Sequence, residues 1–62
     1  MGRLTAAEYD ALPPVLTADQ VAAILDTTPA RVTRWAAAGK IPGVQIGRQW
    51  RFSKTRLEDF LR

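Results

Sequence analysis

The fold of this chain is decided by residues 16–39, which read LTADQVAAILDTTPARVTRWAAAG. In the first part of this stretch, Thr17 is followed three residues later by Gln20, which is the spacing of a capping box at the start of a helix. We expect this helix to cover residues 18–25, with Leu16 placed before the cap to pack on its first turn. Its apolar face at helical spacing consists of Val21, Ile24 and Leu25.

A second helix is expected after a short turn. Thr28 is a suitable N-cap, and Pro29 stands at the first helical position, where its missing N–H costs no hydrogen bond. The helix should run to about Ala38 and end at Gly39, because glycine is common just past a helix C-terminus. Asp26 stands in the turn, and aspartate tolerates a left-handed backbone. Two short helices joined in this way are the sequence form of a helix-turn-helix.

The rest of the chain predicts a small β-hairpin and a last helix. We expect strands at 44–46 and 50–52, joined by a turn at 47–49. Gly47 supplies the special backbone geometry that such a turn needs. Ser53 is then placed to cap a helix over about 54–61. Its expected buried stripe is Leu57, Phe60 and Leu61. The expected fold class is mainly α with a small β-hairpin.

An N-terminal arm of residues 1–15 precedes the main domain, which we assign to residues 16–62. A threonine and a glutamate with capping-box spacing predict a short helix over 6–12, and two consecutive prolines end it. Two interpretations of the arm remain open. Its larger side chains either form a contact surface for another protein molecule or pack on their own domain. These side chains are Leu4, Tyr9 and Leu12.

The composition excludes several classes of function. The 62 residues include no cysteine and no histidine, which excludes disulfides and a zinc site of the usual type. The absence of cysteine fits a reducing cytosol. No apolar run approaches the ~18 residues of a membrane span, and no signal-peptide pattern is present. The chain also lacks a glycine-rich phosphate loop and convergent carboxylates. We therefore expect no enzyme activity, no cofactor and no bound metal.

The positive charge is concentrated in one half of the chain. The formal net charge is only +3, but all six carboxylates lie outside residues 28–56. A field of one sign attracts polyanions, and clustered basic residues are an indication of nucleic-acid binding. The basic residues of this segment are Arg31, Arg34, Lys40, Arg48, Arg51, Lys54 and Arg56.

The second helix has one apolar face and one basic face. Val32, Trp35 and Ala36 share one side at helical spacing, and the size of Trp35 predicts that this side faces the core. The opposite side is expected to enter the major groove of DNA, where arginine can bind guanine with two parallel hydrogen bonds or clamp a phosphate. The expected contact residues are Thr28, Ala30, Arg31, Thr33 and Arg34. The alternative is that the arginines only make a surface helix soluble.

The hairpin is expected to provide a second DNA contact. Arg48 and Gln49 stand at its turn and are placed to enter a minor groove. Arg51 alternates with Trp50 and Phe52, so it should face away from these two aromatic residues, which we expect in the core. Arg51 is therefore the third expected DNA contact of the wing. Weaker contacts with the DNA backbone are expected from Lys40, Lys54 and Arg56.

Four motifs of the chain belong together: Leu16-Thr17-x-x-x-Val21-Ala22-x-x-Leu25, Arg31-Val32-x-x-Trp35, Gly39-Lys40-Ile41-Pro42 and Ile46-Gly47-Arg48-x-Trp50-Arg51-Phe52. With these motifs the chain resembles the excisionase type of winged helix-turn-helix, which is related to MerR-type DNA-binding domains. The resemblance covers about residues 16–61. It implies two short helices, a β-hairpin wing and a further helix, with the second helix in the major groove and the wing in the adjacent minor groove.

The resemblance implies a recombination directionality factor of a phage or mobile element, located in the cytoplasm of a bacterial host on its DNA. Such a protein binds repeated sites on double-stranded DNA beside an attachment site, bends the DNA and directs an integrase toward excision. It also associates cooperatively with further copies on the DNA. One alternative is a small MerR-like transcriptional regulator or its DNA-binding domain. Another is a basic module that binds an acidic protein.

Overall fold

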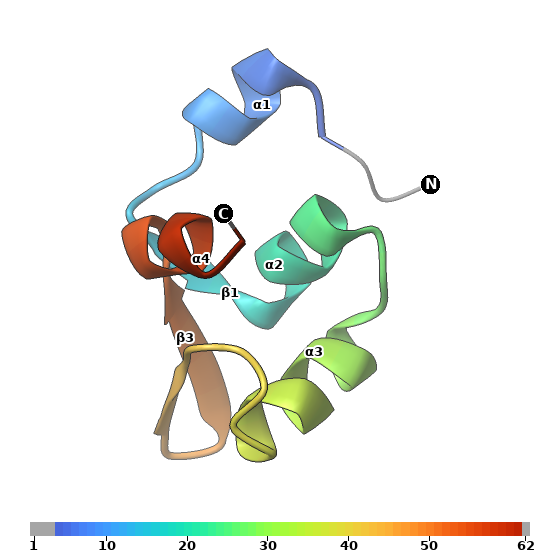
Figure 1. Cartoon of the computed structure of the whole chain (residues 1–62), viewed down its shortest axis with the longest axis vertical. Coiled ribbons are helices and arrows are strands. Elements are labelled where there is room, and N and C mark those ends of the chain that lie inside the picture. The colour runs from blue at the N-terminus through green and yellow to red at the C-terminus, as the bar shows by residue number, and fades with distance from the viewer. Residues whose placement is uncertain (1–3, 62) are drawn as a thin grey trace.

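The computed structural model describes residues 4–61, and it is mainly helical with a three-stranded antiparallel sheet (Figure 1). Its elements are α1 (Ala6–Asp10), β1 (Val15–Thr17), α2 (Ala18–Leu25), α3 (Pro29–Ala37), β2 (Val44–Ile46), β3 (Gln49–Ser53) and α4 (Lys54–Leu61). The strand order is β1-β3-β2. The expected fold class is confirmed: the two helices α2 and α3 form the helix-turn-helix, and the β2–β3 hairpin forms the wing.

The caps predicted for α2 and α3 are present. The Thr17 hydroxyl accepts a hydrogen bond from the Gln20 N–H at 3.2 Å, and the Gln20 side chain accepts one from the Thr17 N–H at 2.9 Å. At the start of α3, the Thr28 hydroxyl accepts a hydrogen bond from the Arg31 N–H at 3.3 Å. Between the helices, Asp26 has a left-handed backbone with φ 57°. These local signals fix both ends of the turn, which is why the sequence defines the helices so closely.

Strand β1 was not predicted from the sequence. It begins at Val15, among residues that we assigned to the arm, and it pairs with β3. Leu16 lies opposite Phe52, and both side chains are almost fully buried. Three residues are too few to show the alternation that identifies a strand. β3 also begins one residue earlier than expected, because Gln49 pairs with Ile46 and does not belong to the turn.

The core lies between the α2–α3 pair, β3 and the start of α4. Its buried residues are Leu16, Val21, Ala22, Val32, Ala36, Ile41, Phe52 and Leu57. The prediction of a three-residue buried stripe on α4 was wrong, because Leu57 is buried but Phe60 and Leu61 are 51% and 52% exposed. Only the first half of α4 packs on β3 closely enough to bury a side chain. The Ser53 cap is present, since its hydroxyl accepts a hydrogen bond from the Arg56 N–H at 3.3 Å.

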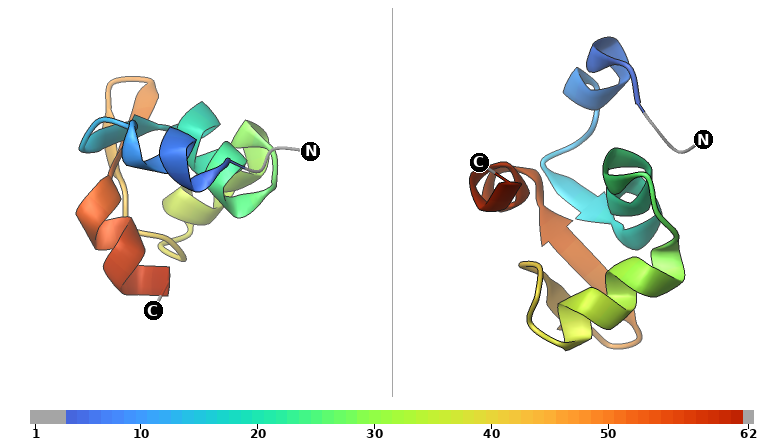
Figure 2. Two further views of the ribbon diagram at one scale, coloured as in Figure 1. Left: turned by 90° about the horizontal axis from the view of Figure 1, so that it is seen from above. Right: turned by 45° about the vertical axis from the view of Figure 1, so that its right-hand side comes forward.

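Helix α1 lies at one end of the molecule, beside α4 and above α2 (Figures 1 and 2). It ends at Asp10, two residues earlier than predicted. The Tyr9 hydroxyl donates a hydrogen bond to the Glu58 carboxylate, and Leu12 packs against the core. The backbone N–H of Lys54 donates to the carbonyl of Pro14 at 2.9 Å. These contacts agree with the interpretation that the arm packs on its own domain.

Candidate nucleic-acid interface

Helix α3 presents its apolar side to the core and its basic side to solvent. Val32 and Ala36 are buried, and Trp35 is half-buried against the core. On the other side, Ala30, Arg31 and Arg34 are exposed, as is the N-cap residue Thr28. Thr33 is half-buried, and its hydroxyl donates a hydrogen bond to the Ala30 carbonyl at 3.0 Å. The predicted division of the helix into two faces is therefore present.

The wing lies beside α3 at the end of the molecule away from α1 (Figure 1). Gly47 has a φ of 64° in its turn, a conformation that side chains other than that of glycine rarely adopt. On the inner face, the rings of Trp50 and Phe52 stack with their centroids 6.3 Å apart. Trp50 is half-buried and Phe52 is buried, as predicted, while Arg48 at the tip is exposed. The aromatic residues thus hold the wing on the domain.

A hollow of about 320 Å³ lies between α3 and the wing. Residues from three parts of the chain line it: the start of α2, the middle of α3 and the wing. The lining residues are Thr17, Ala18, Asp19, Thr33, Arg48, Gln49, Trp50 and Arg51. Four of the predicted DNA-contact residues, one from α3 and three from the wing, therefore share one concave surface.

Arg51 differs from Arg48 in its surroundings. Arg51 is half-buried, and its Nη1 donates a hydrogen bond to the Trp50 carbonyl at 2.9 Å. Its Nη2 donates a hydrogen bond to the side-chain oxygen of Gln49. Two of the three predicted wing contacts are thus bonded to each other.

The three weaker candidates lie apart from this hollow. Lys40 is exposed past the end of α3, where its N–H donates to the Trp35 carbonyl at 2.8 Å. The ammonium of Lys54 lies over the ring of Tyr9, so this lysine contacts the arm. Arg56 lines a different hollow of about 420 Å³, together with Pro42, Gly43, Val44, Arg51 and Ser53.

Asp19 is a member of the interface hollow that the sequence did not reveal. It is exposed in the first turn of α2 and lines the hollow together with Arg48 and Arg51. In the sequence it lies well outside the basic segment. The pairing of β1 with β3, which places Thr17 opposite Arg51, brings the start of α2 beside the wing. The surface is therefore basic with one carboxylate at its edge.

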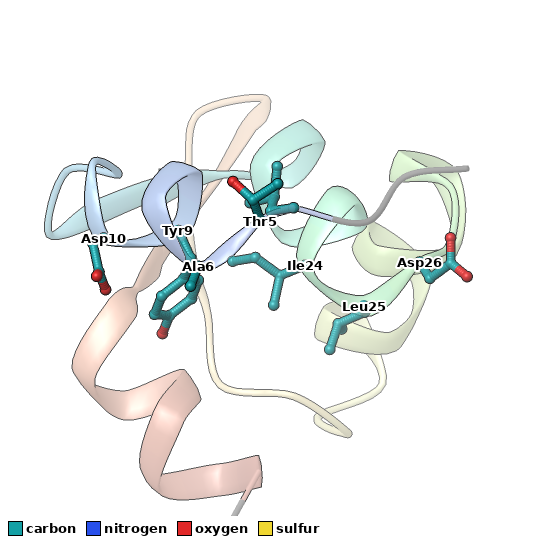
Figure 3. A pocket seen from close by; sticks show the side chains of 8 residues that line it. Thr5, Ala6, Tyr9, Asp10, Ile24, Leu25 and Asp26 are labelled. Carbon is teal, nitrogen blue, oxygen red and sulfur yellow. The ribbon is translucent and has the colours of Figure 1, made fainter.

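A second hollow of about 490 Å³ lies at the other end of the molecule, between α1 and α2 (Figure 3). Tyr9 and Ala6 of α1 lie across it from Ile24 and Leu25 of α2. Its charged lining residues are Asp10 and Asp26, and no basic side chain lines it within residues 4–61. The charged side chains that line the two hollows therefore differ: Asp10 and Asp26 line the one at the arm, and Arg48, Arg51 and Asp19 line the one at α3 and the wing.

A helix-turn-helix followed by a β-hairpin wing defines the winged helix-turn-helix class. Residues 15–62 match the protein family described as "Helix-turn-helix domain", and the chain belongs to this family. Membership indicates a DNA-binding domain, with DNA as its partner. The comparisons with curated proteins and with solved structures gave no significant match. Across residues 4–61, the helices are all too short or too polar to cross a membrane.

Proposed function

We propose that the protein is a sequence-specific binder of double-stranded DNA that acts as an excisionase. In this proposal α3 enters the major groove and the wing enters the adjacent minor groove. The observation that carries the proposal is the hollow shared by α3 and the wing, in which Thr33 and Arg48 face the same space. In this docking the sugar-phosphate backbone between the two grooves lies at the hollow, and the basic field around it favours a polyanion.

The residues of α3 are proposed to read the DNA sequence. Arg31 and Arg34 are three residues apart on the exposed side of the helix, so both can reach the floor of one groove. Thr28, Ala30 and Thr33 lie on or beside the same side and contribute contacts to phosphates, methyl groups or base edges. Arg48 at the wing tip is placed for the minor groove, whose negative potential attracts arginine.

The excisionase role rests on the resemblance of the motifs in both helices and in the wing. It predicts that the protein does no chemistry. Instead it binds repeated sites beside an attachment site in a bacterial cytoplasm, bends the DNA and helps an integrase to assemble for excision. Cooperative contacts between copies on adjacent sites are part of this proposal. Such contacts would make occupancy of neighbouring sites steeper than that of one isolated site.

The test is a nuclease footprint of the protein on fragments of its own source genome at several salt concentrations. Protection of several tandem sites in the same orientation, next to an attachment site, is the expected result. Protection of a single inverted site over a promoter would instead identify a MerR-like regulator, because inverted half-sites reflect a two-fold symmetric dimer. The absence of binding at low salt would overturn the DNA proposal and favour a module that binds an acidic protein.

The salt series has its own expected result. The affinity should fall steeply as salt rises, because each phosphate that the protein neutralises releases counterions. A double variant, Arg31→Ala with Arg34→Ala, is the matched control. It should lose the protected sites while retaining residual, strongly salt-dependent binding to any duplex. If the double variant protects the same sites with the same affinity, α3 does not read the DNA.

A further inference from the structure

The guanidinium of Arg51 is bonded within the wing. One terminal nitrogen donates to the Trp50 carbonyl at 2.9 Å, and the other donates to the side chain of Gln49. Because Gln49 and Arg51 are two residues apart on one strand, their side chains lie on the same face of the sheet. The side chain of Arg51 therefore runs along β3 toward the wing tip. Each of its two terminal nitrogens therefore uses one of its two N–H groups within the wing.

Arg51 also occupies the central position of the sheet. β3 lies between β1 and β2, and Arg51 has Thr17 as its neighbour on one side and Val44 on the other. The same outer face carries three aliphatic side chains that are 56–64% exposed: Val15, Val44 and Ile46. These three residues and Arg51 line one apolar hollow. The aliphatic stem of an arginine covers such a surface while its charged end stays in contact with polar groups.

Trp50 and Phe52 hold the inner face of the wing on the domain, whereas β2 is exposed. β2 has only three residues, and all of them are exposed. β3 also pairs with β1, but β2 is an edge strand that pairs with β3 alone among the described strands. The tip extends beyond the last pair, Ile46 with Gln49, and carries Gly47 and Arg48. The bond from Arg51 to Gln49 runs within β3 and orders the side chains at the strand end that supports the tip.

We propose that Arg51 is a positioning residue that braces the wing, and that it does not neutralise a DNA phosphate. The inference deepens the proposed function and rests on it, because it concerns how the wing meets DNA. Arg48 then carries the charge that the wing brings to the duplex. The side chains of Arg51 and Gln49 lose conformational entropy when the protein folds. This entropy is therefore not lost again when the protein binds DNA.

The first part of the test needs no DNA. Hydrogen exchange of the backbone amides in β2 and β3 is compared between the parent chain, Arg51→Lys and Arg51→Met. Lysine keeps the charge but not the planar fork, and methionine keeps an apolar stem without donors. Both variants should exchange several-fold faster in β2 and at Gln49, with unchanged exchange in α2. Gln49→Val removes the acceptor and keeps a good strand residue, so it should have the same effect.

The second part measures the affinity for the footprinted DNA at several salt concentrations. Both Arg51 variants should bind about three- to tenfold more weakly, with the salt slope of the parent. This loss is about the net contribution of one hydrogen bond, of the two that Arg51 donates within the wing. The matched control is Arg48→Gln, which should leave exchange in the wing unchanged. Its salt slope should fall by about 0.9, the value for one phosphate contact.

Two results would overturn the proposal. The first is unchanged amide exchange in Arg51→Lys, Arg51→Met and Gln49→Val, which would mean that the bonds do not support the wing. The second is a salt slope that falls by about 0.9 in Arg51→Met and stays at the parent value in Arg51→Lys, which is the behaviour of a phosphate ligand. If the parent chain binds no DNA, the proposed function fails, and the exchange experiment still decides whether Arg51 braces the hairpin.

Discussion

The ammonium of Lys54 lies 4.4 Å from the centre of the Tyr9 ring, so the first residue of α4 holds the N-terminal arm. The Tyr9 hydroxyl donates to Glu58, one helical turn further along α4. Lys54 thus contacts the face of the Tyr9 ring, and Glu58 accepts a hydrogen bond from the Tyr9 hydroxyl. This arrangement explains the place of Lys54, which we had expected to contact the DNA backbone.

Tyr9→Phe should lower the stability of the domain only modestly. The variant loses the hydrogen bond to Glu58 but keeps the ring under Lys54, and one such bond near the surface contributes about 1 kcal/mol. Tyr9→Leu removes both contacts and should cost about 0.5–1 kcal/mol more. Urea unfolding measures both changes. Equal stability of the parent, Tyr9→Phe and Tyr9→Leu would mean that the arm is not held through this ring.

The same contact predicts how stability depends on pH. The hydrogen bond to Glu58, with smaller effects of burial and nearby carboxylates, raises the pKa of Tyr9 from 10.0 to about 12. The folded state therefore favours the neutral phenol, so this contribution is complete below pH 10 and is lost as the pH rises through about 12. Because lysines also titrate in this range, the measurement is the difference in unfolding free energy between the parent and Tyr9→Phe. This difference should shrink between pH 10 and pH 12, and a constant difference would contradict the prediction.

The sequence predicted the helix-turn-helix and the wing well because their signals are local. Thr17 and Gln20 cap α2, Thr28 caps α3, and Gly47 permits the turn of the wing. Each of these signals lies within a few residues of the element that it defines. Such short-range rules need no knowledge of the rest of the fold. The basic side of α3 followed in the same way, because Trp35 identified the side that faces the core.

The missed features depend on contacts between distant parts of the chain. The strand β1 forms only because β3 is beside it, and this pairing brings Asp19 to the wing. Spacing along α4 suggested that Phe60 is buried, but no layer of the domain covers it. The side-chain bond between Gln49 and Arg51 is a further case, since a period of two predicts a shared face but not a contact.

Asp19→Asn should strengthen DNA binding. The carboxylate lines the basic hollow with Arg48 and Arg51, where it repels phosphates. Its removal should raise the affinity severalfold at low salt, and the gain should shrink as salt screens the charge. Asp19 also stands at the N-terminus of α2, so the variant should lose a few tenths of a kcal/mol in stability. DNA titrations at two salt concentrations measure this change in affinity. Asp59→Asn on α4 is the control and should bind DNA like the parent.

Gly43→Ala should destabilise the domain by overpacking the base of the wing. A Cβ at residue 43 would lie 2.6 Å from Cε2 of Phe52, which is almost fully buried and has little room to move. Overpacking of this kind typically costs about 1–3 kcal/mol. Gly39→Ala is the comparison, because its Cβ would meet no atom within 4 Å and its φ of 75° brings only backbone strain, about 1–2 kcal/mol. The variants separate by near-ultraviolet circular dichroism, since only Gly43→Ala should change the signal of Trp50 and Phe52. An aromatic signal and a stability in Gly43→Ala that both equal those of the parent would contradict the prediction.

Arg31→Ala and Arg34→Ala should each weaken binding to the footprinted site by about 1–3 kcal/mol if the residue binds a base with two hydrogen bonds. Both side chains are exposed on α3, away from the buried Val32 and Ala36, so the fold should be unaffected.

Arg31→Lys separates the two modes of contact, because lysine keeps a phosphate contact but cannot form the paired bonds to guanine. The measurement is the ratio of affinities for the site and for a duplex of scrambled sequence. A base contact predicts that this ratio falls in Arg31→Lys as well as in Arg31→Ala, whereas a phosphate contact leaves the ratio unchanged in both. If neither the affinity nor the ratio changes in any of the three variants, α3 has no role in reading the sequence.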